Sequence, residues 1–148
     1  MKIGIIGSRG YPYIYSGYET FVKETFELLS DKYEVHIYCH RHLFKNRPKL
    51  VNGIHLHYIP TINHKVLSQL SNSFWSTIHA VFFEKYDVIL FYAAQQWTLD
   101  AALPILDKIK TNIYLATCGF SGLKKINYKN YFKILKKKLF LFNRNIVH

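Results

Sequence analysis

The sequence predicts an α/β fold, with a doubly wound, mostly parallel, Rossmann-like sheet in a single domain. Short apolar runs of strand length alternate with longer segments of helical periodicity, which is typical of parallel βαβ units. The first apolar run ends on a glycine, and more glycines follow. The 148 residues are 49% hydrophobic and 20% charged, enough for one domain with a buried core.

The first third of the chain contains two expected strands and one helix. The segment Lys2–Ile6 is apolar and stops at Gly7, and Glu34–Cys39 alternates between apolar and polar residues. Between them, Gly17–Ser30 has helical spacing, with an apolar face made by Tyr18, Phe21, Val22, Thr25, Leu28 and Leu29. The glutamates are expected on a solvated face, and Glu19, early in this helix, is expected to favour the helix end electrostatically or to orient the glycine loop. The next segment, 41–52, is a polar, proline-containing connection.

The remaining elements follow the same alternation. We expect strands at Ile54–Ile59, with an exposed or edge face, at Asp87–Phe91, Asn112–Thr117 and Asn145–Val147. We expect helices at Asn63–Lys85, Leu99–Lys108 and Tyr128–Phe142. The long middle helix has one apolar stripe, expected to face the sheet: Val66, Leu67, Leu70, Phe74, Ile78, Val81 and Phe82.

Composition narrows the cellular setting. No run approaches the ~20 apolar residues of a membrane span, and the chain begins directly with a strand, so we expect neither a span nor a signal peptide. The two cysteines, Cys39 and Cys118, lie at expected strand ends, which favours a reduced, cytoplasmic interior over a disulfide framework.

The net charge of +11 belongs to the carboxyl-terminal end of the chain. Residues 1–107 carry ten basic and nine acidic side chains, whereas residues 108–148 carry ten basic side chains and no acid. Such a basic segment suits an anionic lipid, a nucleic acid or an acidic substrate.

The glycine-rich loop after the first strand is the strongest candidate site. A strand, a glycine loop and a helix together offer free backbone N–H groups and a positive helix end to an anion, so we expect a phosphate-approaching loop formed by Gly7, Ser8, Arg9, Gly10 and Gly17. Its spacing does not fit a dinucleotide turn or a P-loop. The alternatives are a flexible surface loop and, for Arg9, simple solvent exposure instead of a phosphate clamp.

This opening resembles the amino-terminal domain of bacterial GT-B glycosyltransferases of the large retaining family 4. The resemblance rests on the residues Lys2–Pro12 and Gly17–Val22, which follow the pattern K-I-x-I-I-G-[ST]-R-G-x-P and then G-[FY]-E-T-F-V. It continues more weakly through about the first 90 residues and thereafter by spacing only.

The resemblance implies that residues 1–148 are the acceptor-side, Rossmann-like half of a transferase whose carboxyl-terminal donor-binding domain is absent from this chain. A sugar would move from a nucleotide-sugar donor to a lipid-linked glycan in cell-surface polysaccharide synthesis, with no cofactor and no metal. Where related enzymes have His-Gly or Asp-Gly, this chain has Cys118–Gly119, so its catalytic residue is unknown. We therefore expect the chain alone to have little or no activity.

Ligands of parallel sheets gather at the carboxyl ends of the strands. That rule groups the glycine loop with segment 39–41 and with an expected sugar-binding rim made by Tyr92, Gln95, Gln96, Trp97 and Gly119. Loop capping and core filling are the alternatives for these residues, and a small buried residue is the alternative for Cys118. The eight histidines include pairs spaced by two, but no nearby acid or cysteine completes a zinc set, so we expect exposed strand histidines.

The basic segment predicts a peripheral membrane contact. Aromatic and aliphatic residues recur at helical intervals over 128–142, and the lysines expected to face anionic lipid at the inner face of the membrane are Lys129, Lys133, Lys136 and Lys137. A helix docked on the sheet with solvated lysines is the plainer explanation. No helix-turn-helix, RRM or KH signature is present, so nucleic acid is not an expected partner.

Two functions therefore stay open. One is the acceptor half of a glycosyltransferase that works with a carboxyl-terminal donor domain or a separate subunit. The other is a nonenzymatic membrane anchor, or a remnant, of a split glycosyltransferase.

Overall fold

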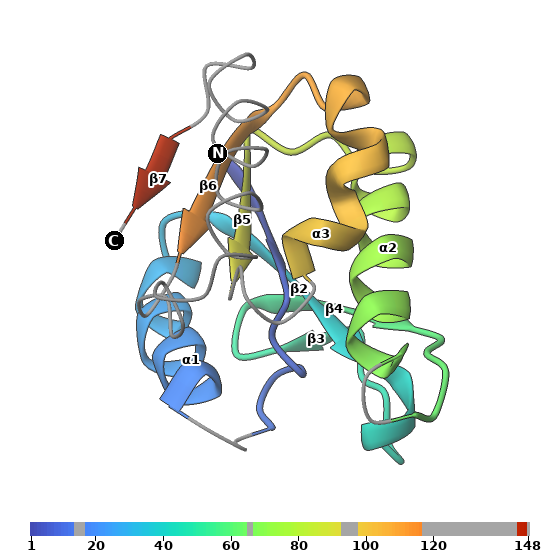
Figure 1. Ribbon diagram of the computed structural model, residues 1–148. Helices are drawn as coiled ribbons and strands as arrows, with labels where there is room; N and C mark the ends of the chain where they lie inside the picture. Colours follow the sequence, from blue (N-terminus) through green and yellow to red (C-terminus); the bar gives the residue numbers. More distant parts are fainter. Residues whose placement is uncertain (14–16, 65–66, 93–97, 117–144, 148) are drawn as a thin grey trace.

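The computed structural model describes residues 1–13, 17–64, 67–92, 98–116 and 145–147. These residues form an α/β fold built on a mixed, mostly parallel β-sheet (Figure 1). Seven strands are hydrogen-bonded in the order β3-β4-β2-β1-β5-β6-β7. All neighbouring pairs are parallel except β3 with β4. The strands are β1 (Lys2–Ile6), β2 (Glu34–His40), β3 (Leu50–Val51), β4 (Ile54–Ile59), β5 (Val88–Tyr92), β6 (Asn112–Ala116) and β7 (Asn145–Val147).

The described helices are α1 (Gly17–Ser30), α2 (Leu67–Phe82) and α3 (Thr98–Ala102), with the 3₁₀ turns η1 (Arg41–Leu43) and η3 (Leu103–Lys108). Every expected strand is confirmed to within about one residue. The short strand β3 was not expected; it lies within the polar connection and pairs with β4, which is therefore not the edge. The expected single helix over 99–108 is instead α3 followed by a 3₁₀ turn, because Pro104 lacks the N–H that a continuing α-helix needs.

Helices lie on both sides of the sheet, and each side has its own core. In Figure 1, α1 lies on one side and α2 and α3 lie on the other. Alternate residues of β1 divide between the two cores, with Ile3 and Ile5 packed beneath α1 and Ile6 beneath α2 and α3. This division follows from the two-residue period of a strand, which sends successive side chains to opposite faces.

The inner face of α1 differs from the expected one. Val22, Phe26 and Glu19 are buried, whereas Phe21 and Leu28 are exposed. The expected solvated face of glutamates is therefore wrong at Glu19, which is only 5% exposed. The carboxylate of Glu19 accepts from the Arg9 backbone N–H at 3.3 Å, which agrees with the role in orienting the loop that we expected for this residue.

The side of α2 that faces the sheet also differs from the predicted one, and by more than in α1. The residues with at most 2% exposure are small and mostly polar: Asn72, Ser73, Ser76, Thr77 and Ala80. The apolar side chains point outward or lie at the margin, with Trp75 and Phe82 more than half exposed. The sheet face beneath α2 carries the bulky rings of Tyr38 and the β2 and β4 histidines, so small helix residues let the two layers approach each other.

The buried polar groups of α2 are largely satisfied by hydrogen bonds, as burial requires. Asn72 Nδ2 donates to the Cys39 carbonyl at 3.4 Å, and Ser76 Oγ donates to Asn72 Oδ1 at 3.3 Å. Thr77 Oγ1 donates to the Ser73 carbonyl at 2.6 Å. The described helices include none with the length and apolar character needed to cross a membrane.

Candidate functional site

The described part of the glycine loop after β1 packs closely against the protein at residues 7–11, where Arg9 is the most accessible side chain. Ser8 and Tyr11 are each 1% exposed, whereas Arg9 between them is partly exposed. Gly7 and Gly10 have φ values of +114° and +136°, a backbone conformation that other residues rarely adopt. The two glycines thus turn the chain so that the intervening side chains alternate between the interior and the surface.

The close approach at these glycines is made by the protein itself, not by a free anion site. A Cβ at Gly7 would lie 2.3 Å from the Tyr92 carbonyl oxygen, and one at Gly10 would lie 2.7 Å from the Phe44 ring. A Cβ at Gly17 would meet nothing within 4 Å. The requirement for glycine at positions 7 and 10 is therefore internal packing, and Gly17 shows no such requirement.

One loop amide that we expected to be open is occupied. The Arg9 backbone N–H donates to the buried Glu19 carboxylate at 3.3 Å, and the Arg9 carbonyl accepts from the His40 backbone N–H at 3.0 Å. Glu19, in the first turn of α1, therefore takes the place that a bound anion would take at this amide. The expectation of a cradle of bare main-chain amides is therefore wrong at Arg9, whose amide is not available to a bound anion.

A second glutamate of α1 anchors the end of the loop. The Tyr11 hydroxyl donates to the Glu27 carboxylate and accepts from Asn52 Nδ2 at 2.7 Å. Burial, together with the Glu27 carboxylate, raises the pKa of Tyr11 to about 12, so the phenol stays protonated. Glu27 is therefore a structural anchor and not part of a solvated face.

A polar pocket of about 310 Å³ opens beside this loop, at the carboxyl ends of β1 and β2. Its lining comes from the loop, from β2 and η1, and from the segment around the start of α2: Arg9, His40, His42, Leu43, Asn63, His64, Ser68 and Gln69. This is where a parallel sheet normally presents its ligand site, as the sequence predicted. The first turns of α2 complete the site, a contribution that sequence reasoning missed.

His40 is the buried group of this pocket. It is 2% exposed, its Nδ1 lies 3.2 Å from Ser68 Oγ, and its Nε2 has no hydrogen-bond partner among the described residues. Burial, with the nearby positive charges of His42 and Arg9, lowers the pKa of His40 to about 4, opposed by the adjacent Gln69. At neutral pH this ring is therefore an uncharged hydrogen-bonding group beside a guanidinium.

Gln69 links the first turn of α2 to the glycine loop and to α3. Its Nε2 donates to the Gly7 carbonyl at 3.0 Å and to Thr98 Oγ1 at 3.2 Å. These two bonds use both amide protons and leave Oε1 as the acceptor, beside the His40 ring. The pocket thus combines the Arg9 guanidinium with histidine, hydroxyl and amide groups, a combination that suits a phosphorylated or hydroxyl-rich ligand.

The expected sugar-binding rim is only partly described. Tyr92 is 4% exposed, and its ring packs edge-on against Tyr18 and stacks on Phe21. Tyr92 is therefore a packing residue beneath α1, which agrees with the core-filling alternative. It is not an open platform for a sugar. The other predicted residues lie outside the described residues: Gln95, Gln96, Trp97, Cys118, Gly119, Lys129, Lys133, Lys136 and Lys137.

The expectation of exposed histidines holds at His42, which lies in η1, and is wrong for the histidines of the strands. His36 and His40 are 5% and 2% exposed, and His55 and His57 are half-buried beneath α2. The sequence did offer one acid, because Glu34 lies two residues before His36 in the same strand, whereas Glu84 follows α2 and reaches this face only in the folded chain. A further signal was available in the small, polar residues of α2 at positions 72, 73, 76 and 77, which imply a crowded facing surface.

Comparison with known proteins adds no assignment. No protein-family model matches the chain, and no curated protein shows significant similarity to it.

Proposed function

We propose that this chain is the acceptor-binding half of a glycosyltransferase, with a doubly wound Rossmann-like sheet, and that the pocket beside Arg9 holds a phosphate-bearing sugar. The observation that carries the proposal is the convergence of Arg9, neutral His40 and the fixed Gln69 at the carboxyl edge of β1 and β2. The resemblance of the opening motif to family 4 glycosyltransferases supports the reaction class, a transfer from a nucleotide sugar to a lipid-linked glycan.

The roles of the lining residues follow from their chemistry. Arg9 pairs with the phosphate, because a guanidinium binds phosphate oxygens with two parallel hydrogen bonds. His40 Nε2 and Gln69 Oε1 take sugar hydroxyls, each of which can donate and accept. No residue of the pocket is assigned a catalytic role, so a separate donor domain supplies the transfer step.

Binding is tested by calorimetric titration of the full chain with a simple sugar phosphate, such as glucose 1-phosphate. We expect binding that Arg9→Gln weakens by roughly tenfold or more, because a charge-assisted phosphate contact contributes about 1.5–3 kcal/mol. Lys45→Gln is the matched control, since Lys45 lies outside the pocket lining. Equal affinities for the two variants, or no binding at all, would contradict the proposal.

A nonenzymatic anchor of a split glycosyltransferase is the second candidate, favoured by the acid-free basic segment at 108–148. In both cases the chain lies at the inner face of the membrane through Lys129, Lys133, Lys136 and Lys137. The two candidates differ in the pocket, because an anchor alone needs no affinity for a sugar phosphate.

A further inference from the structure

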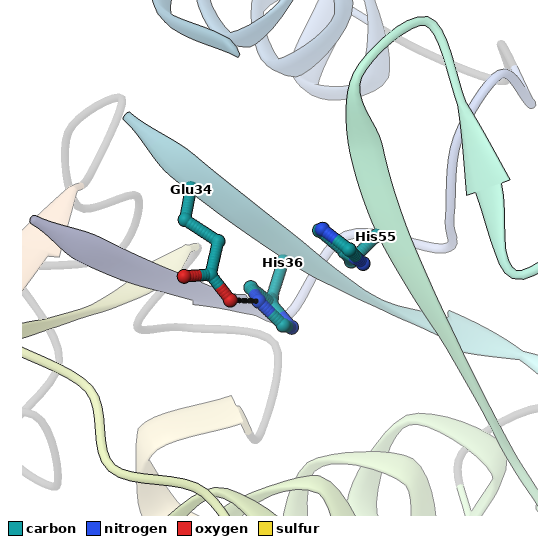
Figure 2. A group of neighbouring side chains, drawn as sticks. All are labelled: Glu34, His36 and His55. Atoms are coloured by element: carbon teal, nitrogen blue, oxygen red, sulfur yellow. Dashed lines mark hydrogen bonds and ion pairs between the residues drawn. The ribbon is translucent and has the colours of Figure 1, made fainter. Parts of the chain in front are cut away.

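A cluster of histidines and glutamates lies on the α2 side of the sheet, at the opposite end of the strands from the sugar-phosphate pocket. It includes Glu34 and His36 at the amino end of β2, and His55 in the paired position on β4 (Figure 2). His36 and His55 are register partners on neighbouring parallel strands, and their rings stack with centroids 4.6 Å apart. Nothing in the proposed transferase function uses these side chains.

We propose that Glu34, His36 and His55 form a binding site for a divalent transition-metal ion, with Zn²⁺ as the best-suited ion. Two imidazoles and one carboxylate are a known zinc ligand set that leaves further coordination positions for solvent. One potential ligand atom from each residue lies within 4.8 Å of the others. Ligands of a tetrahedral zinc ion are about 3.3 Å apart, and the lone pair of an imidazole nitrogen lies in the plane of its ring, so the half-buried His55 ring must turn out of its stack with His36 to complete the site.

The hydrogen bonds of His36 assign its two ring nitrogens different roles. Nε2 lies 2.8 Å from Glu34 Oε1, the contact drawn in Figure 2, and Nδ1 lies 2.8 Å from His57 Nε2. When Nε2 binds a metal, the proton of Nδ1 is donated to His57. A metal-bound histidine normally has such a partner for its second nitrogen, which fixes the ring and its tautomer.

A second trio, His36, His57 and Glu84, has similar separations but a less available carboxylate. Lys2 Nζ lies 2.6 Å from Glu84 Oε2 and 3.5 Å from Glu34 Oε1, so the lysine is held mainly by Glu84. The Glu34 side chain is about half exposed and can turn toward the ion. His55 also lines an open pocket of about 590 Å³ with His57 and His79, which provides an entry route for the ion.

The test uses the untagged full chain, freed of metal with EDTA and titrated with zinc chloride. We expect one bound Zn²⁺ and, at a free zinc concentration near 100 times Kd, a rise in melting temperature of about 5–10 °C. Glu34→Gln and His55→Gln should each weaken binding by more than about 100-fold, since even outer partners of metal ligands contribute 10–100-fold. The exposed His42→Gln and Glu24→Gln are the matched controls and should bind zinc as the wild type does.

Because Glu34 and His55 are not fully buried, both variants are expected to fold, which circular dichroism verifies. The absence of zinc binding by the wild type, or unchanged binding by both ligand variants, would overturn the proposal. Loss of binding in Glu84→Gln and His57→Gln, with Glu34→Gln and His55→Gln unaffected, would equally show that the assigned ligand set is wrong. Failure here leaves the sugar-phosphate pocket untouched, because the two sites share no residue.

Discussion

The conformation of the loop after β1 depends on a few residues with separate roles: Arg9, Glu19 and the two glycines with positive φ. The glycines allow the turn, Glu19 satisfies the Arg9 amide, and the Arg9 side chain lines the pocket. The glycines themselves were predictable from the sequence. Their reason was not, because the contacts at Gly7 come from Tyr92 and Thr98, more than 80 residues away.

Gly7→Ala is expected to destabilise the protein by about 2–4 kcal/mol, because it combines a strained φ with a clash against backbone. Gly17→Ala is the matched control and should change the free energy of unfolding by less than about 0.5 kcal/mol, since its Cβ meets open space. Urea denaturation of both variants measures the difference. A Gly7→Ala protein as stable as Gly17→Ala would show that the loop is not packed as described.

His40 should give the stability a specific pH dependence. Its pKa of about 4 in the folded protein lies below the ordinary value of 6.5, so only the unfolded state gains a proton as the pH falls between these values. Its contribution is therefore fully present above pH 6.5 and is lost progressively toward pH 4, by up to about 3 kcal/mol.

His40→Gln retains a hydrogen-bonding side chain toward Ser68 but does not titrate. Unfolding of wild type and variant is compared from pH 7 to pH 4 in EDTA. The wild type should lose more stability than the variant over this range. Parallel curves would mean that His40 is not buried in its neutral form.

At the scale of elements, the sequence located α1 and α2 but not their rotation, and the helix expected over 128–142 lies outside the described residues. Periodicity identified the apolar stripe of α2, yet the buried side is the one with Asn72, Ser76 and Ala80. A helical hydrophobic pattern normally faces the core, but here the facing strands fill that space with Tyr38 and histidine rings. Such a reversal depends on the partner surface and cannot be seen in the helix sequence alone.

Two adjacent substitutions in α2 test this rotation. Ser76 is fully buried, so Ser76→Gln should cost at least about 2 kcal/mol through overpacking and an unsatisfied amide. Trp75 is about half exposed, so Trp75→Gln should cost less than about 1 kcal/mol. Thermal or urea unfolding gives both values. The opposite order of stabilities would restore the rotation that the sequence predicted.

For the molecule as a whole, the position of the pocket follows from a general rule of parallel sheets. The carboxyl ends of β1 and β2 meet at one edge, so a loop after β1 and a residue such as His40 at the end of β2 had to lie together. The contributions of Ser68 and Gln69 required knowledge of where α2 begins and which side it turns inward. The proximity of His55 and Glu84 to His36 required the same long-range information.

The basic segment predicts a measurable membrane affinity. Near an anionic surface each lysine contributes about 1 kcal/mol, so changing Lys129, Lys133, Lys136 and Lys137 to glutamine should weaken binding to anionic vesicles by roughly 100-fold or more. The matched control changes Lys23, Lys32, Lys45 and Lys49, which preserves the net charge of the first variant. Cosedimentation at about 0.15 M salt separates the two. Equal losses of vesicle binding in the two variants would mean that membrane affinity depends on net charge alone and not on the basic segment.

The central claim, that the pocket beside Arg9 binds a phosphate-bearing sugar, is tested most directly by locating the ligand. Isotopically labelled full chain is titrated with glucose 1-phosphate, and the amide and imidazole NMR signals are followed. The account predicts shifts concentrated at residues 7–11, at the His40 ring and at the Gln69 side-chain amide, absent in Arg9→Gln. Shifts confined to other surfaces, or none at millimolar ligand, would contradict it.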